Sequence, residues 1–546
     1  MDFVRHFGSW LARLAAGALW LSAVFASLSA TAALAEAPGE IPRERLALTS
    51  TLLVMRLEDE AQPSVELPSV LDATALKPDS NASVHTTVSW LDDESETSAN
   101  DGSDSDEKTI AERLEALESK YSDLEESHDE LKDSLAYYAT SGHDAATMKV
   151  NGRVHIDMWQ FPGSSPGVNG FETGDNDVSP ADRLEFRRMR FGVRGDIWHN
   201  MQYKIEMEFA GGNDVEFRDA YLGWDELPVL QTVLLGNQKR PYGLDHWNSS
   251  RFNVFLERPF IIEAFNQDSR RLGIQSWSHS DDLAWNWQYG VFNQRLIQDE
   301  GRYVSDHWQM QVAGRLANTI WYDECSDGRG YAHWAVSGTW ADTDGEQLTE
   351  NYADSGISEA RFRTRPEARS VERWLDTGVI PLAEHYSLLG LENVINLGSL
   401  QLVGEYQNVW VDRELDSELH FHGGYVQAAY FLTGEHMPWN RESGQLDRPV
   451  PFENFFLVDT CRDGVRGGWG AWQGAARWSY GDLADKGVLG GVGESVTLGL
   501  NWLWNPWARM QFNYIYGNIH DNELNAVGGI DFGDYHILGT RFMVDF

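Results

Sequence analysis

Beyond residue 148 the chain repeatedly alternates apolar and polar residues, and this period of two limits the possible folds more than any other feature. In Met201–Phe209, every odd-numbered residue is apolar and every even-numbered residue is polar or charged. Runs that begin near residues 149, 496 and 510 follow the same pattern. Successive side chains of a β-strand point to opposite faces, so each run predicts a strand with one apolar and one polar face. About ten residues are enough for a tilted strand to cross a bilayer.

Residues 146–546 contain sixteen candidate strands of this kind. They start near residues 149, 185, 201, 216, 230, 271, 284, 307, 331, 385, 399, 422, 470, 494, 507 and 534. Short turns such as Gly398–Ser399 alternate with long connections, notably 239–270 and 343–384, as in bacterial outer-membrane barrels. The pattern therefore predicts an all-β fold, a 16-stranded antiparallel transmembrane β-barrel over residues 146–546, and an outer-membrane location.

A soluble β-sandwich would also alternate, but it would bury its apolar faces in a dry core. The chain has 23 Trp residues, and several of them, such as Trp285 and Trp502, lie near the ends of predicted strands. This placement fits the aromatic girdles at the two surfaces of a membrane barrel. The segment His536–Phe546 alternates as well and closes on Phe, which resembles the insertion signal of outer-membrane barrels. These features favour the membrane barrel.

The first 106 residues do not continue the alternation. Arg5 and Arg13 precede an apolar run that ends in Ala33–Leu34–Ala35, which predicts a signal peptide over residues 1–35, with a transmembrane anchor as the alternative. Residues 36–106 are acidic and lack a sustained period, so we expect a disordered linker there.

Residues 107–140 have a different period, with core positions that recur at intervals of four and three. These positions are Ile110, Leu114, Leu117, Tyr121, Leu124, His128, Leu131, Leu135 and Tyr138. Such spacing predicts a short N-terminal coiled-coil helix ahead of the barrel. Tyr121 and His128 need more room than a tight dimer offers, so three chains are preferred, and the expected location is the periplasm. A single amphipathic helix packed on a domain is the alternative.

Ten short segments of the barrel region follow one another in a particular order, and this order makes the set specific although each segment alone is a weak signal. They are 187–195 (RRMRFGVRG), 219–223 (DAYLG), 236–243 (GNQKRPYG), 257–258 (ER), 270–273 (RRLG), 290–293 (GVFN), 363–367 (RTRPE), 430–435 (YFLTGE), 470–477 (GAWQGAAR) and 499–502 (GLNW). Together they resemble the phosphate-selective porin O and P family over roughly residues 149–546. The resemblance implies a sixteen-stranded, trimeric, passive outer-membrane channel whose pore is narrowed by inward-folded loops.

Strand parity separates side chains that face the lumen from those that face lipid. The candidate pore-lining and anion-binding residues are Arg153, Arg188, Arg190, Arg194, Lys204, Lys239, Arg240, Arg251, Arg258, Arg270, Arg315, Arg477, Arg509 and Arg541. A ladder of such cations lowers the electrostatic barrier to anions, and Arg can bind phosphate through two N–H groups. The alternative for each cation is a structural pair with a lumen carboxylate, such as Arg153 with Asp157. The connection 239–270 is the best candidate for the constriction, and Arg361–Arg373 form a second basic group, at the pore or on a solvated loop.

Cys325 and Cys461 are the only cysteines, and both fall on the short-turn side of this topology. An oxidising compartment allows them to form a disulfide, with free or intermolecular thiols as the alternative.

The sequence thus predicts an outer-membrane porin for the passive diffusion of small solutes, preferably anions, with phosphate or polyphosphate as candidate solutes. The alternative is a structural barrel that tethers the outer membrane to the cell wall through its coiled coil. We find no Ser/His/Asp set with supporting strand parity, and we predict no enzyme activity, catalytic residue, metal ligand or cofactor. The expected partners are membrane lipid, small anions such as phosphate, two further copies of the chain and the cell wall. A net charge of −41 argues against nucleic acid as a partner.

Overall fold

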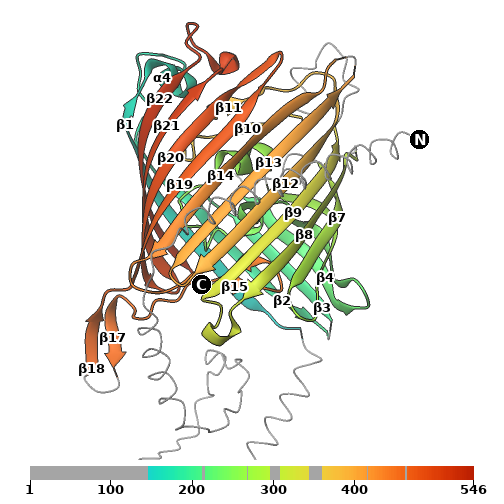
Figure 1. Ribbon diagram of the computed structural model, residues 1–546, viewed down its shortest axis with the longest axis vertical. Coiled ribbons are helices and arrows are strands. Elements are labelled where there is room, and N and C mark those ends of the chain that lie inside the picture. The colour runs from blue at the N-terminus through green and yellow to red at the C-terminus, as the bar shows by residue number, and fades with distance from the viewer. Residues whose placement is uncertain are drawn as a thin grey trace, which may run out of the picture. The chain divides into compact units, whose positions relative to one another are not determined.

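The computed structural model describes residues 146–198, 200–211, 215–266, 269–294, 308–343, 360–414, 416–460 and 464–546. In this part of the chain, sixteen antiparallel strands close into a barrel (Figure 1). The signal peptide, linker and coiled coil expected over residues 1–140 lie outside the described residues.

The strands of the barrel pair in chain order, and β1 closes the barrel by pairing with β22. Their bounds are β1 Lys149–Ser164, β2 Arg183–Ile197, β3 Met201–Glu208, β4 Glu216–Leu227, β5 Gln231–Lys239, β6 Arg270–His279, β7 Trp285–Asn293, β8 Met310–Tyr322, β9 Gly330–Asp342, β12 Ala383–Leu397, β13 Leu400–Arg413, β14 Leu419–Phe431, β19 Ala471–Asp485, β20 Val488–Asn505, β21 Ala508–His520 and β22 Gly533–Asp545. The predicted sixteen-stranded antiparallel barrel is therefore confirmed. Fifteen strands start within three residues of the predicted positions, whereas β20 starts at Val488, six residues before the predicted start near 494.

The period of two places apolar side chains outside the barrel and polar side chains inside it. On β20, Val496 and Leu498 are exposed on the outer face, whereas Thr497 and Asn501 point inward and are fully buried. Large aromatic rings gather at the short-turn end, where Trp472 and Trp502 stack with their ring centroids 5.0 Å apart. In the described residues, no helix is both long enough and apolar enough to cross a membrane.

The barrel wall is uneven in height. Strands β3 to β7 have 8 to 12 residues each, whereas the other strands have 13 to 18. We call the β3–β7 side the short wall and the side from β9 through β22 the tall wall. Most connections at one end of the barrel are short turns, and this end faces the periplasm in bacterial barrels, whereas most connections at the other end are longer. The exceptions are the long β14–β19 connection at the short-turn end and the tight β19–β20 turn at the other end.

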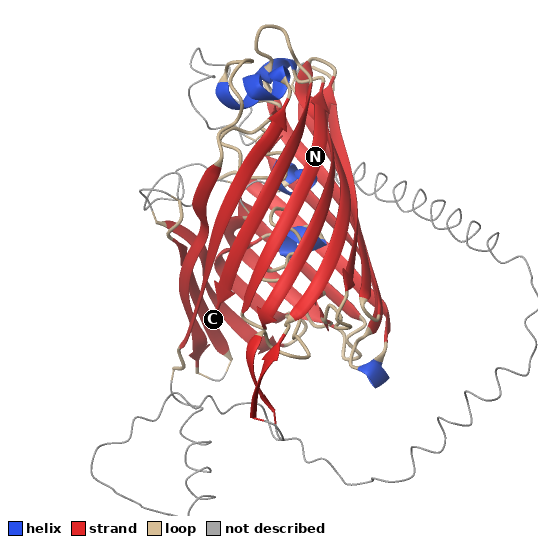
Figure 2. Cartoon of the chain, turned by 90° about the vertical axis from the view of Figure 1, so that its left-hand side faces the viewer, coloured by secondary structure: helices blue, strands red, loops and turns tan. Residues whose placement is uncertain are grey.

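Three connections carry further structure. The β5–β6 connection contains the helices α5 (Leu244–Trp247) and α6 (Phe260–Phe265), and Figure 2 shows short helices inside the barrel. The β9–β12 connection contains the ribbon β10–β11 (Arg363–Thr364 and Leu375–Asp376). The β14–β19 connection contains the ribbons β15–β16 (Trp439–Asn440 and Gln445–Leu446) and β17–β18 (Phe456–Thr460 and Gly464–Gly468).

Three further helical segments complete the described elements. Helix α4 (Pro166–Thr173) lies in the β1–β2 connection. The 3₁₀ turns η2 (Glu324–Ser326) and η3 (Glu523–Asn525) follow β8 and β21.

Candidate solute passage

The β5–β6 connection enters the lumen and packs against the tall wall. Its apolar residues Phe255, Leu256 and Phe260 are almost completely buried. The wall makes room for this connection with glycines, because a Cβ on Gly423 would lie 2.5 Å from the Ile261 side chain. The predicted inward-folded loop is therefore present.

The β14–β19 connection enters the lumen from the opposite, short-turn end and fills the β7–β9 side. Trp439 stacks on Tyr331 at 5.3 Å and donates a hydrogen bond from its indole to Thr319 on β8. The two inserted connections meet, since the Trp247 indole donates to the carbonyl oxygen of Ser443 at 3.2 Å.

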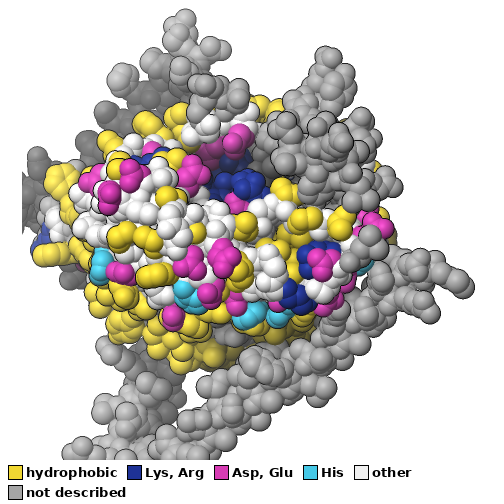
Figure 3. All heavy atoms as spheres, turned by 90° about the horizontal axis from the view of Figure 1, so that it is seen from above, with side chains coloured by type: hydrophobic (Ala, Val, Ile, Leu, Met, Phe, Trp, Pro, Cys, Tyr) yellow, Lys and Arg dark blue, Asp and Glu magenta, His cyan; other side chains and the backbone are white. Residues whose placement is uncertain are grey.

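These two insertions leave a cavity of about 520 Å³ along β1 to β6, so the open lumen lies off-centre, beside the short wall. Twelve Arg and Lys side chains and four carboxylates line it. Figure 3, a view from the end with the long connections, shows Lys and Arg side chains at the bottom of a hollow. The strongly acidic chain thus encloses a lumen in which cations predominate.

Nine of the fourteen predicted site residues line this cavity. They are Arg153, Arg188, Arg190, Arg194, Lys204, Lys239, Arg251, Arg258 and Arg270. The other five, Arg240, Arg315, Arg477, Arg509 and Arg541, do not line the cavity and are buried against the inserted connections.

These five residues hold the insertions against the wall. Arg541 forms a bidentate pair with Asp157, with hydrogen bonds of 2.7 and 2.6 Å, and also donates to the carbonyl oxygen of Leu256. Arg477 pairs with Glu367 at 2.7 Å. Arg315 pairs with Glu392 and donates to the carbonyl oxygen of the inserted Gly444 at 3.0 Å. Arg509 donates to the carbonyl oxygen of Asn253 at 2.9 Å. Arg240 donates to the side-chain oxygen of Gln311 at 3.0 Å.

Three further cations, Arg187, Arg218 and Arg369, line the cavity although parity did not single them out as lumen residues. Arg187 and Arg218 each sit beside an irregularity in strand pairing, where the register between β1 and β2 or between β3 and β4 shifts. Strict alternation fails at such a bulge, because one strand carries an extra residue. An irregularity of this kind gives no clear signal in the sequence.

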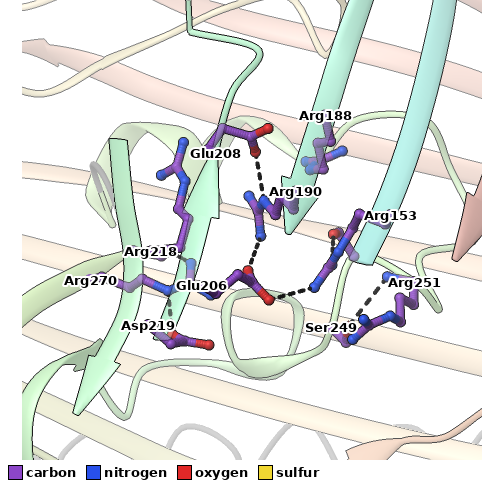
Figure 4. A network of polar contacts seen from close by, with 12 residues as sticks. Arg153, Arg188, Arg190, Glu206, Glu208, Arg218, Asp219, Ser249, Arg251 and Arg270 are labelled. Carbon is purple, nitrogen blue, oxygen red and sulfur yellow. Dashed lines mark hydrogen bonds and ion pairs between the residues drawn. The ribbon is translucent and has the colours of Figure 1, made fainter. Parts of the chain in front are cut away.

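A network of ion pairs crosses the wall of the cavity (Figure 4). Arg190 lies between Glu208 at 2.6 Å and Glu206 at 3.1 Å, and Glu206 also pairs with Arg153 at 3.2 Å. Farther along, Asp219 pairs with Arg270 at 2.5 Å. These cations are largely neutralised by their partners and stiffen the wall.

Three cavity cations differ from this network. Within the described residues, no carboxylate oxygen lies within ion-pair distance of Arg188, Arg194 or Lys239. Arg188 contacts His155 at 3.3 Å, and Lys239 donates to the carbonyl oxygens of Trp247 and Asn248 at 2.8 Å. Arg194 is exposed. The excess positive charge of the cavity is therefore concentrated on these three residues.

Two carboxyl groups on the β5–β6 connection respond differently to their surroundings. Burial raises the pKa of Asp245, although Arg258 lies 3.1 Å away and opposes the shift. Burial would also raise the pKa of Glu257, but Arg187 at 2.7 Å and Arg541 at 2.8 Å hold it well below the ordinary value. Glu257 thus stays ionised at a pH at which Asp245 takes up a proton.

The second basic group predicted from the sequence lies on the β9–β12 connection. Of its five arginines, only Arg369 lines the cavity among the described residues. Arg365 and Arg373 approach Glu263 at 2.6 and 3.7 Å, and Arg361 pairs with Asp376. This group therefore braces the connection on α6 and on its own ribbon.

Cys325 is exposed in the turn η2, and Cys461 lies outside the described residues, so the predicted disulfide stays a prediction. The described part of the chain contains no group of three His, Cys, Asp or Glu side chains that could hold a metal ion.

A sequence profile of the phosphate-selective porin O and P family matches residues 148–546, which include the whole barrel. The chain belongs to this family. Together with the closed sixteen-stranded barrel, membership makes the protein an outer-membrane porin, a channel protein.

Individual relatives are distant. An uncharacterized protein of Caulobacter vibrioides is 28% identical over 413 residues, which cover 73% of this chain and 74% of that protein. Porin O of Pseudomonas aeruginosa is 22% identical over 426 residues, which cover 73% of this chain and 88% of that protein. Among solved structures, an anion-selective porin from Comamonas acidovorans is 12% identical, with a TM-score of 0.44 over 74% of this chain and all of that one.

Proposed function

We propose that the porin conducts small anions by passive diffusion along the short wall. The observation that carries this proposal is the off-centre cavity, whose lining has twelve cations against four carboxylates. Fixed positive charge in a narrow aqueous path lowers the barrier for anions and raises it for cations. Glu206 and Glu208 add negative charge beside Arg190 but leave cations in excess.

Phosphate or polyphosphate is the candidate solute in this proposal. Arg188 and Arg194 lie on one strand and carry guanidinium groups without carboxylate partners in the described residues. A guanidinium group presents two parallel N–H donors that match two oxygens of one phosphate. Chloride offers no such pair of acceptors, so these residues favour phosphate by geometry as well as by charge.

The parts of the chain before the barrel enter this proposal through their sequence patterns. We take residues 1–35 as a signal peptide, 36–106 as an acidic linker and 107–140 as a periplasmic coiled coil that joins three copies. A trimer also suits the short wall, whose outer face is apolar. Attachment of the coiled coil to the cell wall is a second candidate role, which co-sedimentation of residues 36–140 with purified peptidoglycan would test.

Reversal potentials of the purified protein in planar bilayers test the ion preference. Under a KCl gradient we expect a potential that reports chloride as the more permeant ion. Added phosphate should then reduce the chloride current at concentrations at which sulfate does not. A cation-preferring current contradicts the proposed function, and equal inhibition by the two oxyanions contradicts the phosphate assignment.

A further inference from the structure

Part of the cavity lining carries no charge, in contrast to the cations of β1 to β4 (Figure 4). We define the neutral face as the lining residues Leu234 and Gln238 on β5, Gln275 on β6, and His246 and Trp247 on α5. A solute that is held by the cavity cations therefore meets uncharged side chains with the rest of its body.

Strand pairing places the neutral face next to two cations. Lys239, the last residue of β5, pairs with Arg270, the first residue of β6, at the end with the long connections. Gln238 and the cross-strand pair of Leu234 with Gln275 lie farther toward the short turns on the same two strands. A solute that enters from the long-connection end passes Lys239 and Arg270 before it meets the amides.

The amides of the neutral face have hydrogen-bonding groups that the described protein leaves unused. Gln275 is 1% exposed, and neither its amide nitrogen nor its amide oxygen has a hydrogen-bond partner in the described residues. The Gln238 amide nitrogen donates to the carbonyl oxygens of Leu234 and Gly273 at 3.0 and 3.2 Å, whereas its Oε1 has no partner there. An unpaired buried polar group costs free energy, so these atoms need a partner from outside the chain.

His246 adds a third unused group. Its side chain is buried, and Nε2 has no hydrogen-bond partner in the described residues. Burial and the nearby Lys239 ammonium group hold the pKa of His246 well below its ordinary value, so the ring stays neutral. Lys239 also donates to the carbonyl oxygen of Trp247 at 2.8 Å, which keeps α5 beside β5. The unused groups of α5, β5 and β6 therefore belong to one side of the cavity.

These groups do not suit a small inorganic anion. Chloride only accepts hydrogen bonds and phosphate chiefly accepts them, whereas the unused oxygen atoms of Gln238 and Gln275 are acceptors themselves and need a donor. A hydroxyl group donates and accepts, so it can pair with both kinds of amide atom. Leu234 and Trp247 offer apolar contact to the carbon skeleton that carries such hydroxyl groups.

We propose that the cavity binds phosphomonoesters of small polyhydroxylated molecules, such as sugar phosphates, with the phosphate on the cations and the hydroxyl groups on the neutral face. This inference rests on the proposed conduction of anions and specifies the class of solute. The cavity volume of about 520 Å³ lies within the range of small-molecule sites, about 300–1,000 Å³. Inorganic phosphate alone leaves the amides of the neutral face unpaired.

Inhibition of the chloride current through the full-length porin in planar bilayers tests the proposal with three probes. Glucose 6-phosphate carries hydroxyl groups, methyl phosphate is a phosphomonoester without them, and inorganic phosphate tests the proposed function itself. We expect glucose 6-phosphate to inhibit at a concentration about tenfold lower than methyl phosphate, since two or three hydrogen bonds of ordinary strength contribute roughly that factor.

The variant Gln275→Leu removes both amide atoms and keeps the approximate size of the side chain. The matched control Gln288→Leu changes a residue of β7 whose amide is also buried and unpartnered in the described residues but does not line the cavity. With each current taken relative to the KCl current of the same variant, Gln275→Leu should reduce the difference between the two esters to about threefold or less. Gln288→Leu should keep the difference of about tenfold.

Equal inhibition by glucose 6-phosphate and methyl phosphate in the unmodified porin overturns the proposal, whatever the variants show. A difference that persists in Gln275→Leu, or that Gln288→Leu removes as well, overturns the assignment of the hydroxyl groups to the neutral face. If none of the three probes reduces the chloride current, phosphate binding in the proposed function fails together with this inference. Equal inhibition by all three probes overturns this inference alone and leaves the proposed function in place.

Discussion

Replacing Arg188 by Gln removes a lumen cation that has no carboxylate partner in the described residues, and so changes the net charge of the passage by one. An ion that passes about 5 Å from a unit charge in water gains or loses about 0.8 kcal/mol, or about 0.5 kcal/mol after screening at about 0.1 M salt. The change has opposite signs for anions and cations. The ratio of their permeabilities should therefore fall about fivefold, since it changes by about 1 kcal/mol.

The matched control is R190Q/E208Q, which removes a cation together with the carboxylate that lies 2.6 Å from it. This variant leaves the net charge of the passage unchanged, so its permeability ratio should stay within about twofold of the unmodified value. Reversal potentials under a KCl gradient measure both variants. The reasoning is refuted if R188Q leaves the ratio unchanged, or if the charge-neutral variant lowers it as much as R188Q does.

Three further outcomes follow from the contacts inside the lumen. Arg541→Ala leaves the buried Asp157 carboxylate without its bidentate partner and should lower the free energy of unfolding by about 3–5 kcal/mol. Denaturant titration in detergent measures this loss, and an unchanged unfolding midpoint would argue against the bracing role of Arg541. Acidification below pH 7 should increase the anion preference, because burial raises the pKa of Asp245 and this carboxyl beside the cavity cation Arg258 loses its charge. Asp245→Asn should weaken that dependence in reversal-potential measurements. Gly423→Val should displace the β5–β6 connection and increase the single-channel conductance. Gly474→Ala should not, because a Cβ at this position meets open space. Equal conductance of the two variants would contradict the packing of the β5–β6 connection against the tall wall.

Much of the barrel could be predicted because its determinants are local. Alternation along a run such as Met201–Phe209 identifies a strand and both of its faces, since a strand between lipid and water needs one apolar and one polar side. The same rule placed Arg190 and Lys204 toward the lumen, where the structure has them.

Strand alternation in the sequence could not predict features that depend on contacts between distant segments. Parity did not single out Arg187 or Arg218, because each lies beside a shift in strand register. It also could not separate Arg541 from Arg194, although the first is buried against the β5–β6 connection and the second is exposed. That difference depends on where the inserted connections dock.

The ribbon β15–β16 shows the same limit most clearly. Its strands have only two residues each, and it is held by Trp439 against Thr319, more than a hundred residues earlier. No local pattern marks such a segment as part of the lumen. Its docking nevertheless decides which side of the barrel stays open.

The central claim is that solutes cross along the short wall, and cysteine accessibility tests it most directly. In a background with Cys325 and Cys461 replaced by Ser, one cysteine is placed at Arg194 in the cavity and another at Gln401, which faces inward behind Tyr331 and the inserted β14–β19 connection. During single-channel recording, a negatively charged thiol reagent should reduce the current through the variant at Arg194 and leave the variant at Gln401 unaffected. Modification of Gln401→Cys that blocks the current, with no effect at Arg194→Cys, would contradict the account.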